Sequence, residues 1–252
     1  MLILDMEPLE AFSDVVSIMH RLDSLAYFRC NPLMFSILIH QHFPRSIVGL
    51  IMLPQFFTSF SCDQIHYVRF SIDQFYANIL HHKRNAFHSL TLCLAEFRFH
   101  MALEYHSPTH QHPSQQLLPT AQPDRYELAG KIDYGSFISL DLQEFRRLIV
   151  ILDNTKAYVP FTITNSEFKF FLQDRTIIFT TQMNQCIIGG IKAEEEIEGG
   201  ISLYPWEFYY NFTSKRLWLF KSYYPSGITM VAPMGLYANI SSFFPQTFYR
   251  TN

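Results

Sequence analysis

Residues 139–149 read SLDLQEFRRLI, and residues 202–212 read SLYPWEFYYNF. The two stretches align without a gap and share an opening Ser-Leu pair and a later Glu-Phe pair. A shorter relative, SIDQFYANIL, occupies residues 71–80, and a further amphipathic stretch, EPLEAFSDVVSIMHRL, occupies residues 7–22. Because apolar residues recur in these stretches at helical spacing, the sequence predicts four related helices spread along the chain.

Short runs of β-branched and aromatic residues fill the intervals between these helices, which is typical of strands. The predicted strands are Leu25–Arg29, Leu33–Ile39, Ser46–Leu53, Ser89–Leu94, Phe97–Tyr105, Tyr158–Thr164, Glu167–Gln173, Thr176–Gln182, Arg216–Tyr224, Gly227–Val231 and Leu236–Ile240. The pattern therefore predicts an α+β fold in which one unit, a helix followed by several antiparallel strands, is used four times.

One segment does not follow this pattern. Residues 106–124, HSPTHQHPSQQLLPTAQPD, are rich in Pro, His and Gln and show no periodicity. They are interpreted as a connecting loop between two similar domains, residues 1–105 and 125–252, each with two helices packed on antiparallel sheets. We expect no further strand between residues 97–105 and this loop.

The composition sets limits on the class of protein. Of 252 residues, 48% are hydrophobic and only 16% are charged, which excludes a disordered chain. The four cysteines show no C-x-x-C pair, which disfavours a zinc site or a disulfide framework and favours a reducing compartment. The first residues lack a basic region and a long apolar core, and no apolar run is long enough for a membrane span. We therefore expect a soluble intracellular protein.

No motif predicts catalysis. The sequence lacks G-x-S-x-G, H-E-x-x-H and the phosphate-binding G-x-x-x-x-G-K-[ST], so we expect no enzyme and no cofactor. His106, His110 and His112 are spaced such that they could hold a metal ion, but such a segment is more often a polar loop. The pair Cys62–Asp63 could mark a thiol nucleophile, but the sequence places no base beside it, which favours a core cysteine.

Basic residues occur on all four predicted helices, and on three of them they lie near the C-terminal end. They are His20, Arg21, His81, Lys83, Arg84, Arg146, Arg147, Lys215 and Arg216. Cations near a helix C-terminus also complement the helix dipole, which accounts for part of the pattern. The remainder predicts a dispersed basic surface that suits phosphates rather than bases.

Several motifs resemble the DNA sliding clamp family, of the proliferating cell nuclear antigen type. Residues 57–63, FTSFSCD, look like the family's Phe-x-x-Tyr-x-Cys-Asp segment, and QQLLPTAQPDRYE (115–127) is similar to its interdomain connecting loop. KAEEEIEGGISL (192–203) is similar to the family's Lys/Glu-rich hairpin, and GITMVAPMGLYANISSFFPQ (227–246) to its last strands. Each motif is short, but together they occur in the family's order over nearly the whole chain.

The resemblance implies a DNA clamp fold and a trimeric ring, with helices lining a central hole. Such a ring encircles duplex DNA without sequence preference and is placed there by a clamp loader. It tethers DNA polymerase and repair proteins in the nucleus, or at a viral replication site, through short peptide motifs. The implied peptide pocket comprises His40, Ile47, Leu117, Leu118, Pro233, Phe244 and Pro245. The implied subunit edge comprises Thr176, Ile177, Ile178, Phe179 and Thr180.

The chain also departs from the family pattern. Ser13 and Asp14 stand where the family carries lysines, and Val150 stands where another cation is expected beside Arg147. These departures fit a divergent viral or protist clamp that acts as a processivity factor. They equally fit one subunit of a heterotrimeric checkpoint-type clamp in DNA-damage signalling. A clamp-derived interaction protein without DNA binding is a third reading.

Overall fold

The computed structural model describes residues 1–42, 45–94, 99–123, 131–152, 158–172, 174–223 and 226–246. The chain has a mostly-β α+β fold built from antiparallel sheets, and it separates into two compact units. Unit 1 comprises Met1–Ile39, Gly49–Tyr126 and Leu236–Ala238. Unit 2 comprises His40–Val48, Glu127–Gly235 and Asn239–Asn252.

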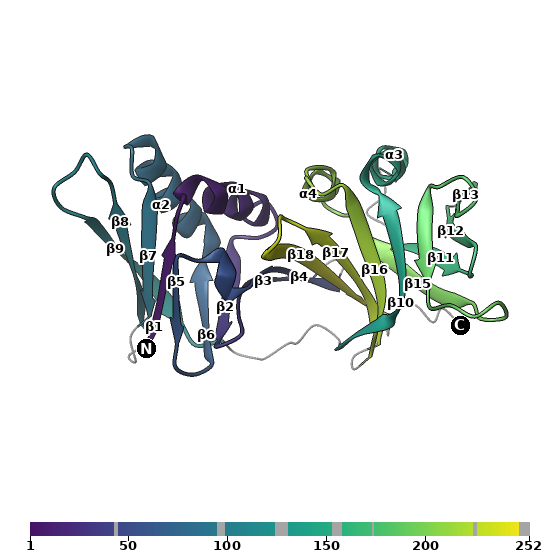
Figure 1. The fold of residues 1–252 in the computed structure, drawn as a ribbon, viewed down its shortest axis with the longest axis horizontal. Helices are drawn as coiled ribbons and strands as arrows, with labels where there is room; N and C mark the ends of the chain where they lie inside the picture. The colour runs from purple at the N-terminus through teal and green to yellow at the C-terminus, as the bar shows by residue number, and fades with distance from the viewer. Residues whose placement is uncertain are drawn as a thin grey trace. The chain divides into compact units, whose positions relative to one another are not determined.

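Unit 1 alternates single helices with groups of strands (Figure 1). Its elements are β1 (Leu2–Met6), α1 (Leu9–Met19), β2 (Leu25–Asn31), β3 (Met34–His42), β4 (Arg45–Met52), the short 3-10 helix η1 (Pro54–Phe56), β5 (Ser59–Cys62), β6 (His66–Ser71), α2 (Ile72–Arg84), β7 (Ser89–Leu94), β8 (His100–His106) and β9 (Ser114–Ala121). The end of β3 and the start of β4 belong to unit 2. The strand order in unit 1 is β3-β2-β6-β9-β8-β7-β1-β5.

Unit 2 repeats this alternation. Its elements are β10 (Lys131–Asp141), α3 (Leu142–Leu152), β11 (Tyr158–Ile163), β12 (Glu167–Phe171), β13 (Thr176–Thr180), β14 (Cys186–Gly189), β15 (Ile197–Ser202), α4 (Trp206–Tyr210), β16 (Arg216–Tyr223), β17 (Gly227–Pro233) and β18 (Ala238–Pro245). One sheet has the order β14-β10-β16-β17-β18, and a separate four-stranded sheet has the order β13-β12-β11-β15.

The two units share one strand-pairing scheme. In unit 1 the order β5-β1-β7-β8-β9 matches the order β14-β10-β16-β17-β18 in unit 2, and β6-β2-β3-β4 matches β15-β11-β12-β13. With β5 and β14 set aside, each α-helix is preceded along the chain by one strand and followed by three before the next such unit begins. The predicted unit of a helix plus several strands, used four times, is therefore confirmed.

Apolar faces and local caps explain the helices. The periodic residues of α1 are buried, and Phe12 packs edge-on against Phe75 of α2 with ring centroids 5.9 Å apart. Ser71 accepts a hydrogen bond from the backbone N–H of Gln74 at the start of α2. Asp141 accepts one from the N–H of Gln143 at the start of α3. Such side-chain acceptors satisfy N–H groups that have no partner within the helix.

Most predicted strands occur at the expected places, and Ser89–Leu94 coincides with β7. The expectation that no strand follows residues 97–105 is wrong, because Ser114–Ala121 form β9 and pair with β8. The missed segment contains Pro119 and a weak polar pattern, and neither feature indicates a strand. Residues 124–130, where the resemblance places the rest of the connecting loop, lie outside the described residues.

Candidate nucleic-acid interface and strand edges

The exposed surface of α1 and α2 carries both signs of charge. The ammonium nitrogen of Lys83 lies 3.3 Å from a carboxylate oxygen of Glu10 and 3.4 Å from one of Asp14. Arg21 and Arg84 are exposed and make no ion pair with the described residues. The acidic residues of α1 therefore offset part of the positive charge that α2 contributes.

The histidines at the ends of α1 and α2 differ in exposure. The ring of His20 stacks on Tyr76 with centroids 4.2 Å apart, and its Nδ1 lies 2.7 Å from the carbonyl oxygen of Ser17. The His20 ring is therefore held by contacts with α1 and α2, whereas His81 is exposed. A phosphate could reach His81 more readily than His20.

Arg146 and Arg216 hold the backbone of unit 2. The guanidinium of Arg146 donates to the carbonyl oxygens of Tyr210 and Phe212, at 3.1 and 2.7 Å, where α4 ends. Arg216 donates to the hydroxyl and the carbonyl oxygen of the buried Ser139, at 2.7 and 2.9 Å. The sequence assigned both arginines to a DNA-facing surface, but in this structure their donors serve internal acceptors.

Two further cations of unit 2 point to solvent. Arg147 is exposed and lies 2.5 Å from the carboxylate of Glu144, one helical turn earlier on α3. Lys215 is exposed and has no side-chain partner among the described residues. Of the predicted phosphate contacts, Arg21, Arg84 and Lys215 are therefore the cations with exposed and unpaired side chains in the described chain.

Among the described residues, one edge of β9 has no partner strand over most of its length. Residues Ser114–Pro119 pair with β8 on one side, and only the last two residues of β9 pair with β6. The side chain of Leu118 is buried in the core of unit 1, whereas that of Leu117 is 67% exposed. An open edge with an exposed apolar side chain is a template for another strand.

A groove of about 350 Å³ lies on the solvent face beside this edge. Ala102 and Leu117 give it apolar walls, and Gln115 donates a hydrogen bond to the carboxylate of Glu104 at 2.9 Å. Burial raises the pKa of the Cys93 thiol in this groove, and the nearby carboxylates of Asp5 and Glu104 act in the same direction. The groove is therefore apolar with an acidic rim.

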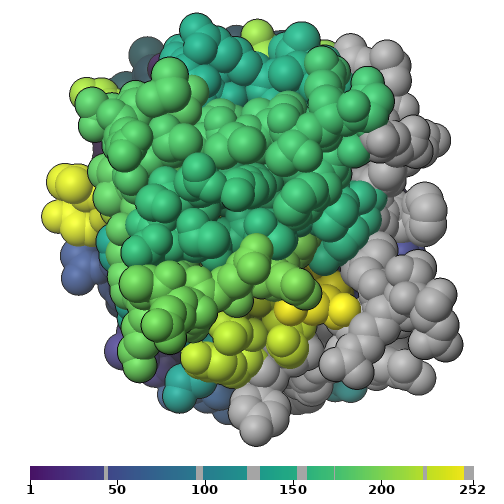
Figure 2. Space-filling view, turned by 90° about the vertical axis from the view of Figure 1, so that its right-hand side faces the viewer, coloured from purple at the N-terminus to yellow at the C-terminus, as the bar shows by residue number. Residues whose placement is uncertain are grey.

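Unit 2 has a second open edge at β13, the outer strand of its four-stranded sheet. Figure 2 faces the side of unit 2 on which this sheet lies, and its teal and green residues cover most of the view. Ile178 is 45% exposed, whereas Phe179 is buried against the sheet. In the described chain β13 pairs only with β12. The predicted subunit edge, Thr176–Thr180, thus forms an outer strand.

The predicted peptide pocket is divided between the two units. Leu117 and Leu118 lie in β9 of unit 1, and His40, Ile47, Pro233, Phe244 and Pro245 belong to unit 2. Ile47, Phe244 and Pro245 are buried. The grouping of all seven residues into one site stays a prediction.

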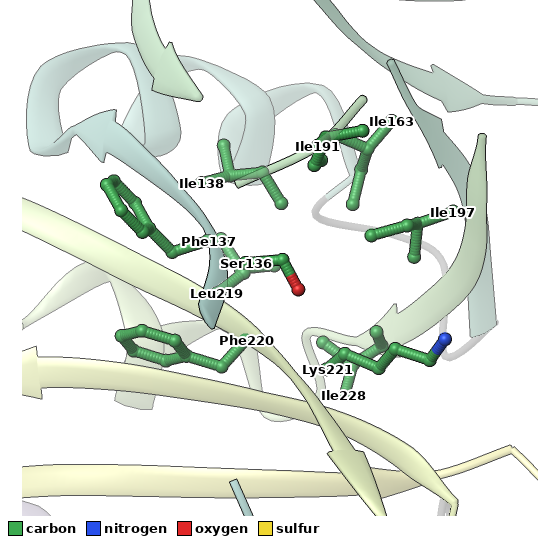
Figure 3. Close-up of a pocket in the computed structure, with 10 residues that line it drawn as sticks. All are labelled: Ser136, Phe137, Ile138, Ile163, Ile191, Ile197, Leu219, Phe220, Lys221 and Ile228. Carbon is green, nitrogen blue, oxygen red and sulfur yellow. The ribbon is translucent and has the colours of Figure 1, made fainter. Parts of the chain in front are cut away.

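The interior of unit 2 contains a cavity of about 10 Å³ (Figure 3). Isoleucine side chains, among them Ile138, Ile163 and Ile197, surround it, and Ser136 and Lys221 are its polar neighbours. A space of this size holds about one water molecule. The cavity is therefore a packing defect rather than a ligand site.

His82 is a structural residue that the sequence analysis passed over. Its buried ring stacks on Tyr105 with centroids 3.7 Å apart, and its Nε2 lies 2.9 Å from the hydroxyl of Ser114 at the start of β9. Burial lowers the pKa of His82. The spacing of Phe75, Ile79 and His82 places the histidine on the apolar face of α2, and this signal could have identified it.

In the described part of the chain, no helix is both long and apolar enough to cross a membrane. Among the same residues, no three His, Cys, Asp or Glu side chains cluster as metal ligands. Instead, the Nε2 of His106 lies 3.2 Å from the hydroxyl of Thr91, within hydrogen-bonding distance, and the ring of His110 stacks on that of Phe87.

No protein-family model matches the sequence, and no curated protein matches it either.

Proposed function

We propose that this chain is a subunit of a ring-forming sliding clamp that encircles duplex DNA and tethers DNA polymerase and other replication or repair proteins. The observation that carries the proposal is the pairing scheme shared by the two units, with its fourfold repeat of one strand, a helix and three strands. A chain built from equivalent units is suited to a ring, because each unit offers the next the same kind of edge. The motif order along the sequence adds support.

The open edges suggest how the ring closes. In the described chain β9 has an unpaired edge over most of its length, and β13 pairs only with β12. A pairing of β9 from one subunit with β13 from the next would cover both edges. Because the two edges differ, the contact is heterologous, and repetition with the correct rotation gives a closed ring.

The clamp would act through topology rather than chemistry, so the proposal includes no catalytic residue and no cofactor. Its site of action would be the nucleus or a viral replication site. Partner proteins would dock short peptides at the predicted pocket residues that belong to unit 2, among them His40 and Pro233. Exposed Arg21, Arg84 and Lys215 would contact phosphates without reading bases.

A second candidate function follows from the helix charges. Lys83 is paired with Glu10 and Asp14, and Arg147 is paired with Glu144. A helix surface with so few free cations favours a clamp-derived interaction protein that does not hold DNA. A heterotrimeric checkpoint-type clamp would use the same edges, but it would close only with two different clamp-like chains.

Retention on DNA tests the first candidate against the second. We expect the assembled protein to stay on closed circular DNA and to leave the same DNA once it has been linearised. Changing Arg21, Arg84 and Lys215 to Glu should reduce retention and lower the slope of its salt dependence by about one unit per lost phosphate contact. Lys192→Glu, in an exposed loop of unit 2, is the matched control. Equal retention of the triple variant and the control would favour the second candidate.

A further inference from the structure

Two cysteine thiols meet inside unit 1. Cys30 lies in β2 and is fully buried, and Cys62 ends β5 and is partly exposed. Burial raises the pKa of the Cys30 thiol, and a side-chain hydrogen bond with the Cys62 thiol raises it further. Cys62 also donates to the carbonyl oxygen of Gln64 at 3.0 Å. A buried sulfur therefore lies directly behind one that solvent can reach.

The backbone and a side-chain bridge hold this arrangement. In the β2–β6 ladder Cys30 stands directly opposite His66. The Nε2 of His66 lies 2.9 Å from the carboxylate of Asp63, the residue that follows Cys62. Directly opposed residues in an antiparallel pair have neighbouring side chains. Cys30 and the residue that follows Cys62 are thus both linked to His66.

The other two cysteines provide a contrast. Cys93 lies on β7 in unit 1, and Cys186 lies on β14 in unit 2. In the described residues neither makes a contact with another thiol. Burial and the contact with Cys62 raise the pKa of Cys30, so its sulfur remains a thiol until a partner reacts with it. Cys62 is the sulfur that an oxidant from solvent meets first.

We propose that Cys30 and Cys62 form a reversible disulfide when the protein meets a hydroperoxide. The Cys62 thiolate attacks the peroxide oxygen and becomes a sulfenic acid, and the hydroxide or alkoxide that leaves takes up a proton. The Cys30 sulfur then attacks the Cys62 sulfur, a disulfide bond forms, and the sulfenic hydroxyl leaves as water with the Cys30 proton. The peroxide is reduced by two electrons and the two thiols are oxidised by two, and a dithiol reductant reverses the reaction.

The disulfide would join the interior strand β2 to the outer strand β5. In the unit 1 sheet β5 is the last strand and β2 is the second strand from the other end, so the bond would join the two ends of that sheet. The covalent loop would span residues 30–62, and closing a loop of this length restricts the unfolded chain. We therefore expect the oxidised protein to unfold at a higher temperature than the reduced protein. This inference is independent of the proposed function.

The test uses the purified full-length chain. The reduced protein is treated with hydrogen peroxide, free thiols are blocked with an alkylating reagent, and peptides are mapped by mass spectrometry without reduction. We expect one cross-linked pair that contains Cys30 and Cys62, with the loss of two hydrogen atoms, and its disappearance after reduction. Cys93 and Cys186 should remain open to alkylation in the denatured protein.

Two variants identify the order of the reaction. In Cys30→Ser the sulfenic acid of Cys62 should persist and react with dimedone, whereas Cys62→Ser should block oxidation of Cys30. Cys93→Ser and Cys186→Ser should leave the cross-link unchanged. The wild-type map alone would overturn the proposal if Cys62 were oxidised to sulfinic acid without a cross-link, if Cys62 did not react, or if either sulfur paired with Cys93 or Cys186.

Discussion

Arg146 of α3 donates a hydrogen bond of 2.7 Å to the carbonyl oxygen of Phe212, just beyond the end of α4. A second donor of the same guanidinium reaches the carbonyl oxygen of Tyr210. The last carbonyl groups of a helix have no partner within it, so this arginine supplies one from outside. A residue that the sequence suggested for DNA binding thus joins the two helices of unit 2.

Replacing Arg146 with Ala should destabilise unit 2 by about 2 kcal/mol, because hydrogen bonds to a charged group are lost and two carbonyl groups lose their donors. The measurement is urea unfolding followed through a signal from unit 2. Arg147→Ala is the matched control, and it should cost about 0.5 kcal/mol, since an exposed ion pair contributes little. Equal effects of the two variants would contradict the structural role of Arg146.

His82 should make stability depend on pH. Burial lowers its pKa below the unfolded value of about 6.5, so the unfolded chain binds a proton more readily than the folded one. The contribution of His82 to the free energy of unfolding is therefore fully present above the pKa of the unfolded chain. It decreases as the pH falls from that value to the pKa of the folded protein, and at lower pH it is fully lost.

The effect of His82 can be isolated by comparing thermal unfolding curves over pH. The wild-type protein should lose stability as the pH is lowered, and His82→Gln should make this loss smaller. His81→Gln, at the exposed neighbouring position, should lose as much stability as the wild type. Nuclear magnetic resonance titration of the His82 ring should report a pKa below the ordinary value of 6.5. A His82 pKa above the ordinary value would refute the argument from burial.

The strand edges should control assembly. Leu117 is 67% exposed on β9 and Ile178 is 45% exposed on β13, so a charge at either position should leave the fold intact. Under the ring proposal Leu117→Glu or Ile178→Glu would place a charge in a buried contact and weaken association about tenfold or more. Leu33→Glu, at a residue 77% exposed in the turn between β2 and β3, should leave association unchanged. Sedimentation over a range of concentrations measures all three.

The sequence predicts repeated elements better than it predicts individual contacts. The apolar periodicity of α1 and the strand run Ser89–Leu94 depend on local patterning, and both elements form where expected. The strand β9 was missed although it forms a hairpin with β8, the strand just before it. Its polar residues and Pro119 lack the apolar alternation that indicates a strand.

The candidate site shows the same limit. The sequence shows where cations occur, but it does not show which acceptors they meet. Arg146 meets carbonyl groups of α4 more than sixty residues away, and Lys83 meets two carboxylates of α1. The contact between Cys30 and Cys62 likewise depends on strands whose neighbours are set by the tertiary fold. Of these contacts, only the position of His82 on the apolar face of α2 could have been predicted from the spacing of residues in the sequence.

The ring is the central claim, and the mass of the particle tests it most directly. Sedimentation equilibrium of the purified chain, alone and after capture from its native extract, should give a particle three times the chain mass of 29.6 kDa. A trimer of the purified chain alone would support the processivity clamp. A three-chain particle that forms only with two other clamp-like chains would support the checkpoint-type clamp. A monomer at every concentration, with no clamp-like chain in the captured material, would contradict the ring.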